Sequence, residues 1–432
     1  MAQKITIEEA LKLIKDGDHI ISGMAASEGR LFFQNLHKIA DRINHVSVDN
    51  CLPLYAYPYM LEPQYKDKFT INSWFFSADL RKSFQNKNIA FIPNQLHFAG
   101  VKRAQYKTPD VFVGNATPPD KHGFVSLSLS NVYEKHMIKQ AKLVILEINP
   151  NLPRTLGDLE VHESDVDYFV DVDYPAPVLP DSEPSEKDKK IGAYIADLIN
   201  DGDTIQLGIG GIPNAVAAAL MDKKDLGVHT EMLTTGFMKL YKAGVITNKQ
   251  KTLHPGKMVA AFALGTKELY DFIDDNPGIA LLDGNYVNDP CVIGQNDNQV
   301  SINTTIEVDL TGQCASESIG TMQFSGTGGQ TDTATGAQRA KNGRSFITLY
   351  STANVMNKKT GKREPISKIV PTLKPGAAVS LSRNDIDYVV TEYGAVRLRG
   401  TSVKERVEKL ISIAHPDFRE MLKQEAQKIG YI

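Results

Sequence analysis

Short apolar runs alternate with amphipathic stretches along the first half of the chain. Residues 5–15 predict a helix, because Thr6 can cap the first turn and Glu9 stands three positions later, the spacing of a capping box. Strands separated by helical stretches predict a mostly parallel sheet with helices on its faces. The segments with buried-strand character are residues 19–22, 46–48, 89–92, 111–114, 124–129 and 143–148.

The second half of the chain repeats this alternation. Its predicted strands are residues 204–207, 257–264, 278–282, 345–351, 377–382 and 388–391, and its predicted helices are 190–200, 213–220 and 402–428. Residues 316–343 differ, because they contain many glycines and hydroxyls and almost no bulky apolar side chain. A compact domain rarely holds so long a loop without a function, so this segment is a candidate for ligand binding.

Two internal echoes predict that the halves are related by duplication. A helix, the triplet Asp-Gly-Asp, a strand and a small-residue turn occur twice, as IKDGDHIISGMA from residue 14 and INDGDTIQLGIG from residue 199. The second echo is DVDYFVDVDYP at 165–175 against DIDYVVTEYGA at 385–395. A repeated unit of this size predicts two related α/β domains.

A stretch rich in proline and charge, residues 173–190, is the predicted linker between the halves. Proline and charge with little apolar content are typical of a domain boundary. We place that boundary near Glu183, which gives an N-terminal domain over 1–183 and a C-terminal domain over 184–432 that carries the candidate catalytic glutamate described below.

Composition narrows the function classes. The chain has 432 residues, 42% hydrophobic and 23% charged, with a net charge of −3, so no strong field favours nucleic acid or an anionic membrane. Three dispersed cysteines form no disulfide framework, and no window has the length and apolarity of a membrane span. We expect a cytoplasmic protein without nucleic-acid or membrane partners.

The clearest chemical candidate is the turn after residues 204–207, formed by Gly208, Ile209, Gly210 and Gly211 before a small-residue helix. A glycine turn between strand and helix exposes backbone N–H groups to an anion, although a packing turn is the simpler alternative. Glu231 follows a second apolar step. Alone it reads as a surface carboxylate, but among small residues it could serve as a nucleophile or a general base.

Further candidates lie in the C-terminal half. Gly326, Gly328 and Gly329 could form a second backbone-amide loop, able to bind phosphate or stabilise an oxyanion, or could be a flexible connector. Glu392 follows the strand predicted at 388–391, and Arg397 and Arg399 beside it could meet an anionic ligand or be solvated. A loop in the first half, residues 115–123, also follows a strand and could contact substrate. No group of residues has metal-ligand spacing.

With these residues assembled, the chain resembles the acetyl-CoA hydrolase/transferase family, in particular its 4-hydroxybutyrate and butyrate:acetate CoA-transferase branch. Over nearly the whole chain the resemblance rests on the motifs SGMAASEG, DKHGFVSLSLSN, LGIGGIPNAV, HTEM, FSGTGGQTD, TEYGAVRLRG and IAHPDFRE, in the order of the family. The chain departs from many relatives at Thr230 and Arg397. The resemblance implies two related open α/β domains of the NagB/RpiA/CoA-transferase-like type.

The resemblance also implies roles for the candidates. Glu231 matches the glutamate that carries CoA as a glutamyl thioester, and Glu392 matches a second active-site glutamate. The turn from Gly208 to Gly211 matches the CoA-binding loop, and the loop around Gly328 matches the segment that lines CoA and supplies oxyanion N–H groups.

The implied reaction moves CoA from a short-chain acyl-CoA to a free carboxylic acid by ping-pong chemistry. The expected ligands are acyl-CoA and short-chain acids such as acetate, butyrate or 4-hydroxybutyrate, with CoA as substrate and covalent intermediate, no tightly bound cofactor and no metal. The resemblance further suggests a homo-oligomer, a dimer or larger. Two alternatives stay open: an acyl-CoA hydrolase of the same family, and a non-catalytic module that binds a phosphorylated ligand.

Overall fold

The computed structural model describes residues 2–357 and 360–432, which group into two compact units. Unit 1 contains residues 1–181, 231–235 and 257–288, and unit 2 contains 182–230, 236–256 and 289–432. The chain first crosses from unit 1 to unit 2 between Asp181 and Ser182. The segment with Glu231 groups with unit 1, although it lies far beyond that crossing.

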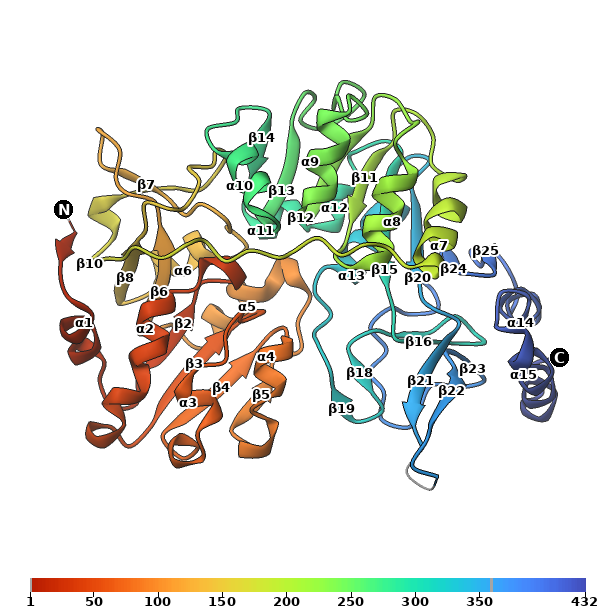
Figure 1. Ribbon diagram of the computed structural model, residues 1–432, viewed down its shortest axis with the longest axis horizontal. Coiled ribbons are helices and arrows are strands. Elements are labelled where there is room, and N and C mark those ends of the chain that lie inside the picture. Colours follow the sequence, from red (N-terminus) through yellow and green to blue (C-terminus); the bar gives the residue numbers. More distant parts are fainter. Residues whose placement is uncertain (1, 358–359) are drawn as a thin grey trace. The chain divides into compact units, whose positions relative to one another are not determined.

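Unit 1 is built on a parallel sheet, shown in Figure 1. The order of its strands is β1 (Gln3–Lys4), β10 (Tyr168–Asp171), β8 (Leu143–Ile148), β6 (Val111–Ala116), β2 (His19–Ser22), β3 (Val46–Asn50), β4 (Phe69–Ser73) and β5 (Ile89–Phe91). The strands predicted at 19–22 and 143–148 are therefore confirmed.

Helices pack on this sheet because their apolar stripes match its buried side chains. On one face lie α1 (Ile7–Leu13), α2 (Arg30–Asn35) and α3 (Pro58–Leu61), whose Leu11, Phe32 and Tyr59 join Val48 and Ile71 of the strands in one buried core. The predicted capping box of α1 is confirmed, since Thr6 Oγ1 accepts from Glu9 N at 3.2 Å and Glu9 Oε2 accepts from Thr6 N at 2.8 Å.

The remaining described elements of unit 1 are short helices, strands and 3-10 turns. They are α4 (Ala78–Arg81), α5 (Ala99–Tyr106), α6 (Glu134–Gln140), α10 (Lys267–Ile273), α11 (Gly284–Val287), β7 (Phe124–Ser126), β9 (Glu160–His162), β13 (Met258–Ala263), β14 (Ile279–Leu281) and the 3-10 turns η1 (Ala25–Ser27), η2 (Leu36–Arg42), η3 (Pro63–Tyr65), η4 (Phe84–Asn86), η5 (Leu96–Phe98) and η6 (Glu163–Asp165).

Unit 2 contains a second parallel run of strands, to which one antiparallel edge strand is added. Its order is β12 (Gly227–Leu233), β11 (Thr204–Leu207), β15 (Gln299–Thr304), β20 (Arg344–Thr348), β24 (Tyr388–Thr391) and β25 (Gly394–Arg397). The end of β12, from Glu231, groups with unit 1.

The two strand orders correspond one to one. The sequence β3-β2-β6-β8-β10 of unit 1 is matched by β12-β11-β15-β20-β24, and each of the two sequence echoes falls on a corresponding pair, β2 with β11 and β10 with β24. Even the backbone after β2 and β11 agrees, because Ala25 (φ 49°) and Gly210 (φ 112°) both have positive φ. The prediction of two related open α/β domains is confirmed.

The other elements of unit 2 surround this run and its core, in which Leu310, Ile347, Val389, Val407 and Leu422 are fully buried. They are α7 (Glu186–Ala196), α8 (Gly211–Ala219), α9 (Thr235–Lys242), α12 (Pro290–Ile293), α13 (Gln330–Arg339), α14 (Val403–Ser412), α15 (Pro416–Ile429), β16 (Glu307–Asp309), β17 (Cys314–Ala315), β18 (Ser318–Ile319), β19 (Met322–Gln323), β21 (Thr352–Met356), β22 (Arg363–Ser367) and β23 (Ile369–Val370). Helix α9 begins in unit 1 at Thr235.

Two sequence predictions were wrong in this unit. The strand predicted at 377–382 is irregular and makes a bridge only at Leu381, because the Ser380 side chain bonds to Ser316 N and to Glu317 in place of a regular ladder. The long loop predicted at 316–343 contains the hairpin β18–β19 and all of helix α13. Threonine and glycine have low helix propensity, so the pattern hid a helix that tertiary contacts stabilise.

The predicted linker at 173–190 ends earlier than expected. Ser185 caps α7 and forms a capping box with Asp188, so the helix begins at Glu186 rather than near residue 190. The lysines and acidic residues of this first turn are therefore part of an ordered helix.

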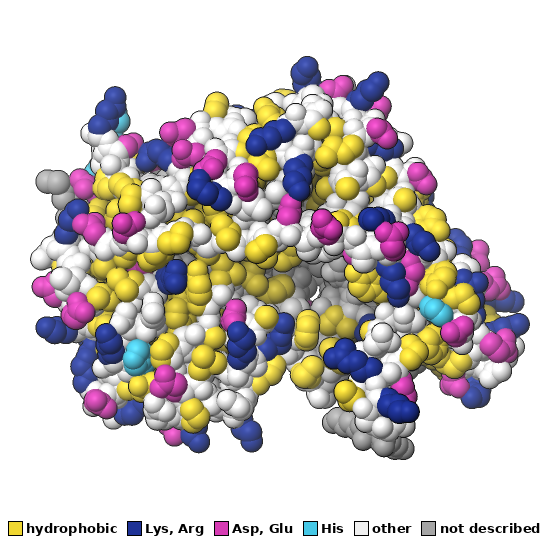
Figure 2. Space-filling view, in the orientation of Figure 1, with side chains coloured by type: hydrophobic (Ala, Val, Ile, Leu, Met, Phe, Trp, Pro, Cys, Tyr) yellow, Lys and Arg dark blue, Asp and Glu magenta, His cyan; other side chains and the backbone are white. Residues whose placement is uncertain are grey.

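On the face shown in Figure 2, Lys and Arg side chains are interspersed with Asp and Glu, as the small net charge allows.

Candidate active site

Glu231 lies in β12 between buried neighbours, and its own side chain is partly exposed. The Asn288 amide donates from Nδ2 to Glu231 Oε2 at 2.8 Å. Asn288 is fully buried at the end of α11, where its backbone N–H donates to Gly284 O at 3.1 Å. A donor fixed on a helix end thus orients one oxygen of the carboxylate and leaves the group within reach of solvent.

The position of α11 depends on the motif SLSLSN of the first half. Gly284 N donates to Asn131 O at 2.9 Å, and a Cβ on Gly284 would stand 2.6 Å from Val132 O. Only glycine permits so close an approach of two backbones. Asp283 caps the helix by accepting from Asn285 N at 2.8 Å. The segment around Asn131 therefore supports the amide that holds Glu231.

A buried thiol and a buried carboxyl complete this neighbourhood of unit 1. Burial raises the pKa of the Cys51 thiol well above its ordinary value, and the charges of Glu231 and Glu134 raise it further. The Glu134 carboxyl accepts from Met24 N at 2.7 Å and from Ser130 Oγ at 2.9 Å, and burial raises its pKa despite these bonds. Motifs far apart in the sequence thus meet around Glu231, and Cys51 stays a neutral thiol beside it.

Glu392 occupies a different environment in unit 2, directly after β24. Its buried carboxylate accepts from Ser351 N at 2.8 Å and from Ser351 Oγ at 2.9 Å, and the Lys187 ammonium lies 3.1 Å from Oε1. Burial alone would raise the pKa of Glu392, but the hydrogen bonds from Ser351 and Lys187 outweigh it and hold the pKa below its ordinary value. Glu392 is therefore a fixed, ionised carboxylate.

The glycine turn from Gly208 to Gly211 joins β11 to α8 as predicted. Gly210 has φ 112°, a conformation that favours glycine, and Ile209 is 44% exposed. A Cβ on Gly211 would stand 2.6 Å from Asp188 Oδ2, so the turn approaches α7 closely. Asp188 also accepts from the Tyr350 hydroxyl at 2.7 Å. Lys187 and Asp188 are neighbours, and the first turn of α7 thereby connects the glycine turn to Glu392.

The loop with Gly326, Gly328 and Gly329 is held by a buried carboxylate. Glu317 accepts from Thr327 Oγ1 at 2.5 Å and from Ser380 Oγ at 2.7 Å. Gly328 has φ 54°, and Gly329 directly precedes α13. The glycines thus stand at the beginning of a helix, where backbone N–H groups lack intrahelical partners.

The candidates divide between the units. Glu392 and both glycine segments lie in unit 2, and Glu231 groups with unit 1. Sequence reasoning missed Asn288, Cys51 and Glu134 around Glu231, because no local pattern marks them. It also missed Lys187 and Ser351, although the capping-box spacing from Ser185 to Asp188 was a usable signal for an earlier start of α7.

Arg397 and Arg399 share a structural partner. Their guanidinium groups lie 3.0 Å and 3.7 Å from Oδ1 of Asp387, which is fully buried. A buried carboxylate requires such compensation. This pairing gives both arginines a structural role.

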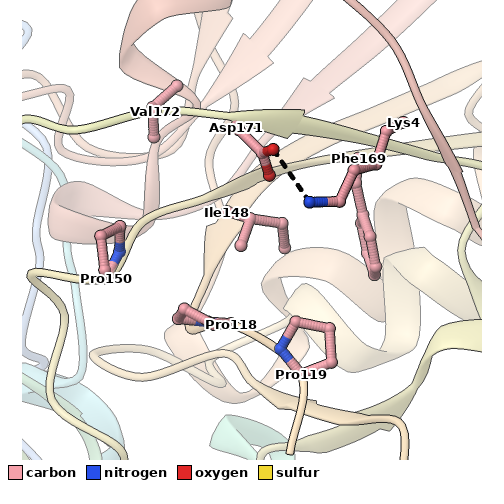
Figure 3. Close-up of a pocket in the computed structure, with 8 residues that line it drawn as sticks. All are labelled: Lys4, Pro118, Pro119, Ile148, Pro150, Phe169, Asp171 and Val172. Atoms are coloured by element: carbon pink, nitrogen blue, oxygen red, sulfur yellow. Dashed lines mark hydrogen bonds and ion pairs between the residues drawn. The ribbon is translucent and has the colours of Figure 1, made fainter.

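The loop after β6 forms a turn beside an apolar pocket. Asp120 accepts from His122 N at 2.8 Å and from Phe124 N at 3.0 Å and pairs with Arg154, which accounts for its carboxylate. Figure 3 shows the adjacent pocket, about 290 Å³, with two prolines of this loop on one side and the Lys4–Asp171 ion pair on the other. Its lining is Lys4, Pro118, Pro119, Ile148, Pro150, Phe169, Asp171 and Val172.

Residues 2–357 and 360–432 contain neither a candidate metal cluster nor a candidate membrane helix. No group of three or more His, Cys, Asp or Glu side chains there could hold a metal ion. Within the same residues, no helix has the length and apolarity that a membrane span requires.

Comparison with known proteins gives matches over nearly the whole chain. The acetyl-CoA hydrolase/transferase N-terminal domain matches residues 2–180, and the C-terminal domain of the same description matches residues 265–426. Succinyl-CoA:cyclohexane-1-carboxylate CoA transferase of Geobacter metallireducens is 42% identical over 98% of this chain and 95% of its own length. The 4-hydroxybutyrate coenzyme A transferase of Clostridium kluyveri is 42% identical over 98% and 97%.

A solved structure shows the same fold throughout. The crystal structure of RipA from Yersinia pestis superposes with a TM-score of 0.92 at 36% identity, covering 100% of this chain and 98% of that one. The predicted family and enzyme class, CoA-transferase, are confirmed by relatives so similar over their full length. The chain belongs to the acetyl-CoA hydrolase/transferase family.

Proposed function

We propose that this CoA-transferase moves CoA from a short-chain acyl-CoA to a free carboxylic acid, such as acetyl-CoA with 4-hydroxybutyrate or butyrate, through a thioester on Glu231. The observation that carries the proposal is the partly exposed Glu231 carboxylate, oriented by the buried Asn288 amide, in a chain 42% identical to named CoA-transferases. A carboxylate is a weak nucleophile in water, and an oriented, partly desolvated one is a better nucleophile.

The proposed reaction proceeds through two acyl transfers. A Glu231 oxygen attacks the thioester carbonyl, and the carbon–sulfur bond breaks. CoA leaves as a thiolate, and the acyl group stays on Glu231 as an acyl-glutamyl anhydride. The thiolate then attacks the Glu231 carbonyl carbon and releases the acyl group as a carboxylate, which leaves glutamyl-CoA. A second carboxylate reverses both steps and departs as its CoA thioester. Thioester energy is retained, so the reaction consumes no ATP.

Other residues receive roles in this proposal. The N–H groups of Gly208, Ile209, Gly210 and Gly211, with those of Gly326 and Gly329, would bind CoA. Gly328 N–H would stabilise the oxyanion, an effect worth about 3–4 kcal/mol per donor. The Glu392 carboxylate would be the second active-site carboxylate. Its fixed, ionised state supports a role in orienting reacting groups rather than in donating a proton.

The proposal also covers properties of the whole protein. We propose a cytoplasmic homodimer or larger homo-oligomer that binds acyl-CoA and short-chain acids, with no tightly bound cofactor, and domains over 1–183 and 184–432. Gel filtration with light scattering measures the oligomeric state.

The decisive experiment is mass spectrometry of the protein after incubation with acyl-CoA, followed by borohydride. We expect a CoA adduct on the peptide with Glu231, and inactivation by borohydride only after acyl-CoA treatment. Persistent absence of the adduct with active enzyme would falsify the thioester proposal. A panel of acyl-CoA donors against carboxylate acceptors then identifies the pair, and CoA release without an acceptor acid would indicate a hydrolase.

A further inference from the structure

The first turn of α7 contains a lysine where a cation is unfavourable. Lys187 is the second residue of the helix, after Ser185 and Glu186. The N-terminal end of a helix carries a partial positive charge, so acidic residues are preferred there and a lysine is unfavourable. The other charged residues of this turn, Glu186 and Asp188, follow that preference. A specific partner is therefore needed to explain the ordered position of Lys187.

That partner is Glu392, and the contact is well defined. Lys187 Nζ and Ser351 Oγ both lie on Oε1 of Glu392, at 3.1 Å and 2.9 Å, and Ser351 N donates to the other oxygen, Oε2, at 2.8 Å. The Glu392 side chain is 4% exposed, and that of Lys187 is 47% exposed. Both carboxylate oxygens are thereby fixed, but only the ammonium supplies a compensating charge within this set of donors.

The residues after β20 hold the ammonium in place. Lys187 Nζ lies 5.8 Å from the centre of the Tyr350 ring and 3.4 Å from Thr352 Oγ1. The Tyr350 hydroxyl is in turn bonded to Asp188, the next residue of the helix. The lysine is therefore positioned from α7 and from this segment together, unlike a surface lysine that samples many rotamers.

We propose that Lys187 is a positioning residue for CoA transfer, whose ammonium keeps Glu392 ionised and aligned for its part in the reaction. This inference rests on the proposed role of Glu392. Lys187 acts through Glu392 and needs no contact with the substrate. Its helix also approaches the glycine turn closely where Asp188 meets Gly211. The first turn of α7 therefore supports both the predicted CoA-binding turn and Glu392.

The charged groups around Glu392 determine the sign of the effect. Lys187 faces it from α7, and Tyr350 faces it from the segment after β20, with Asp188 behind the Tyr350 hydroxyl. The adjacent Tyr393 contacts His415 and Arg419 of the C-terminal helices. Removing the Lys187 ammonium takes away one of the groups that oppose burial and leaves the hydrogen bonds from Ser351 and from the Glu392 backbone. The pKa of Glu392 should therefore rise, and the carboxylate should become protonated at a higher pH.

The test is the pH profile of kcat/KM for Lys187→Met. Relative to the unmodified enzyme, we expect kcat/KM to fall about tenfold or more near pH 5.5 and no more than about threefold near pH 8. The reason is that loss of an ion-pair partner raises the pKa of a buried carboxyl by about one to three pH units. Lys187→Arg should restore the original profile. Lys189→Met, on the same helix and paired with the exposed Glu186, is the matched control and should leave the profile unchanged.

Glu392→Gln separates this inference from the function on which it rests. In that background Lys187→Met should cause no further pH-dependent loss. A Lys187→Met profile that parallels the original at every pH overturns the positioning role, and Lys187→Gln repeats the test if the methionine variant folds poorly. Full activity of Glu392→Gln overturns the role of Glu392 itself, whereas the borohydride experiment on Glu231 tests the transfer chemistry independently.

Discussion

Corresponding corners of the duplicated sheets contain opposite kinds of site. At the ends of β8 and β10, unit 1 has an apolar pocket lined by Ile148, Val172 and three prolines. At the ends of β20 and β24, unit 2 has the polar cluster of Ser351, Lys187 and Glu392. In the second sequence echo, Val172 and Glu392 occupy the same position. The same backbone position can therefore hold an apolar or an ionised side chain, and the side chain sets the character of the corner.

The buried carboxyls of the two units show the same contrast. Burial raises the pKa of Glu28 in unit 1 to about 8, because the hydrogen bond from Leu54 N does not offset the loss of water. Glu392 in unit 2 has a lowered pKa, because Ser351 and the Lys187 ammonium outweigh burial. Of these two buried carboxyls, the one that stays ionised is the one with an ammonium group beside it.

The largest effect should come from Glu231→Gln. The amide is no nucleophile towards a thioester, so we expect a loss of transfer of about a thousandfold or more and no CoA adduct. Steady-state transfer and mass spectrometry measure both. Glu268→Gln, an exposed carboxamide substitution in the same unit, is the control and should retain full activity. Transfer by Glu231→Gln at the original rate would refute its role as nucleophile.

Val172→Glu places the side chain of unit 2 into the corresponding corner of unit 1. No counterpart of Ser351 is available there, and the adjacent Lys4 already pairs with Asp171, so the new carboxyl is buried without adequate donors. We expect a loss of about 2 kcal/mol in the free energy of unfolding, measured in urea at pH 8. The loss should shrink at pH 5, where the carboxyl is protonated.

Val172→Ile is the control for a change of size at the same position, and it should cost less than about 1 kcal/mol. If Val172→Glu were as stable as this control at pH 8, the two corners would differ less than their side chains indicate.

The strands of the two sheets could be predicted from the sequence, whereas the contacts around Glu392 could not. Residues 19–22, 204–207 and 388–391 were predicted strands with the observed bounds, because apolar periodicity is a local property. Helix α13 was missed, since its threonines and its one glycine become helical only through packing. Lys187 was assigned to a linker. Its proposed role depends on the ion pair with Glu392, more than 200 residues away, and no local pattern reveals that contact.

Gly211→Ala copies another difference between the halves, because Ala26 is its counterpart, one position beyond the end of the first echo. The new Cβ would lie 2.6 Å from Asp188 Oδ2, so the turn or the carboxylate must move. We expect KM for acyl-CoA to rise about tenfold with kcat changed less than about threefold, as displaced backbone N–H groups weaken CoA binding. Initial rates over a range of acyl-CoA concentrations measure the split.

Gly244→Ala is the control, since it adds a methyl group at a positive φ in unit 2, where the new Cβ meets no atom within 4 Å. An equal rise of KM in both variants would attribute the effect to general backbone strain and remove the glycine turn from the CoA site.

The smallest effect is expected from Lys4→Met, the counterpart in unit 1 of removing Lys187. The Lys4 and Asp171 side chains are 71% and 61% exposed, so water solvates either charge when its partner is lost. Exposed ion pairs contribute at most about 1 kcal/mol and often nothing, so we expect a change below about 0.5 kcal/mol in unfolding and an unchanged pH profile of transfer. Urea unfolding and the kcat/KM profile are compared directly with Lys187→Met. We attribute the difference between the two corners to burial of the carboxylate that accepts the ion pair. A pH-dependent loss of equal size in both variants would contradict that explanation.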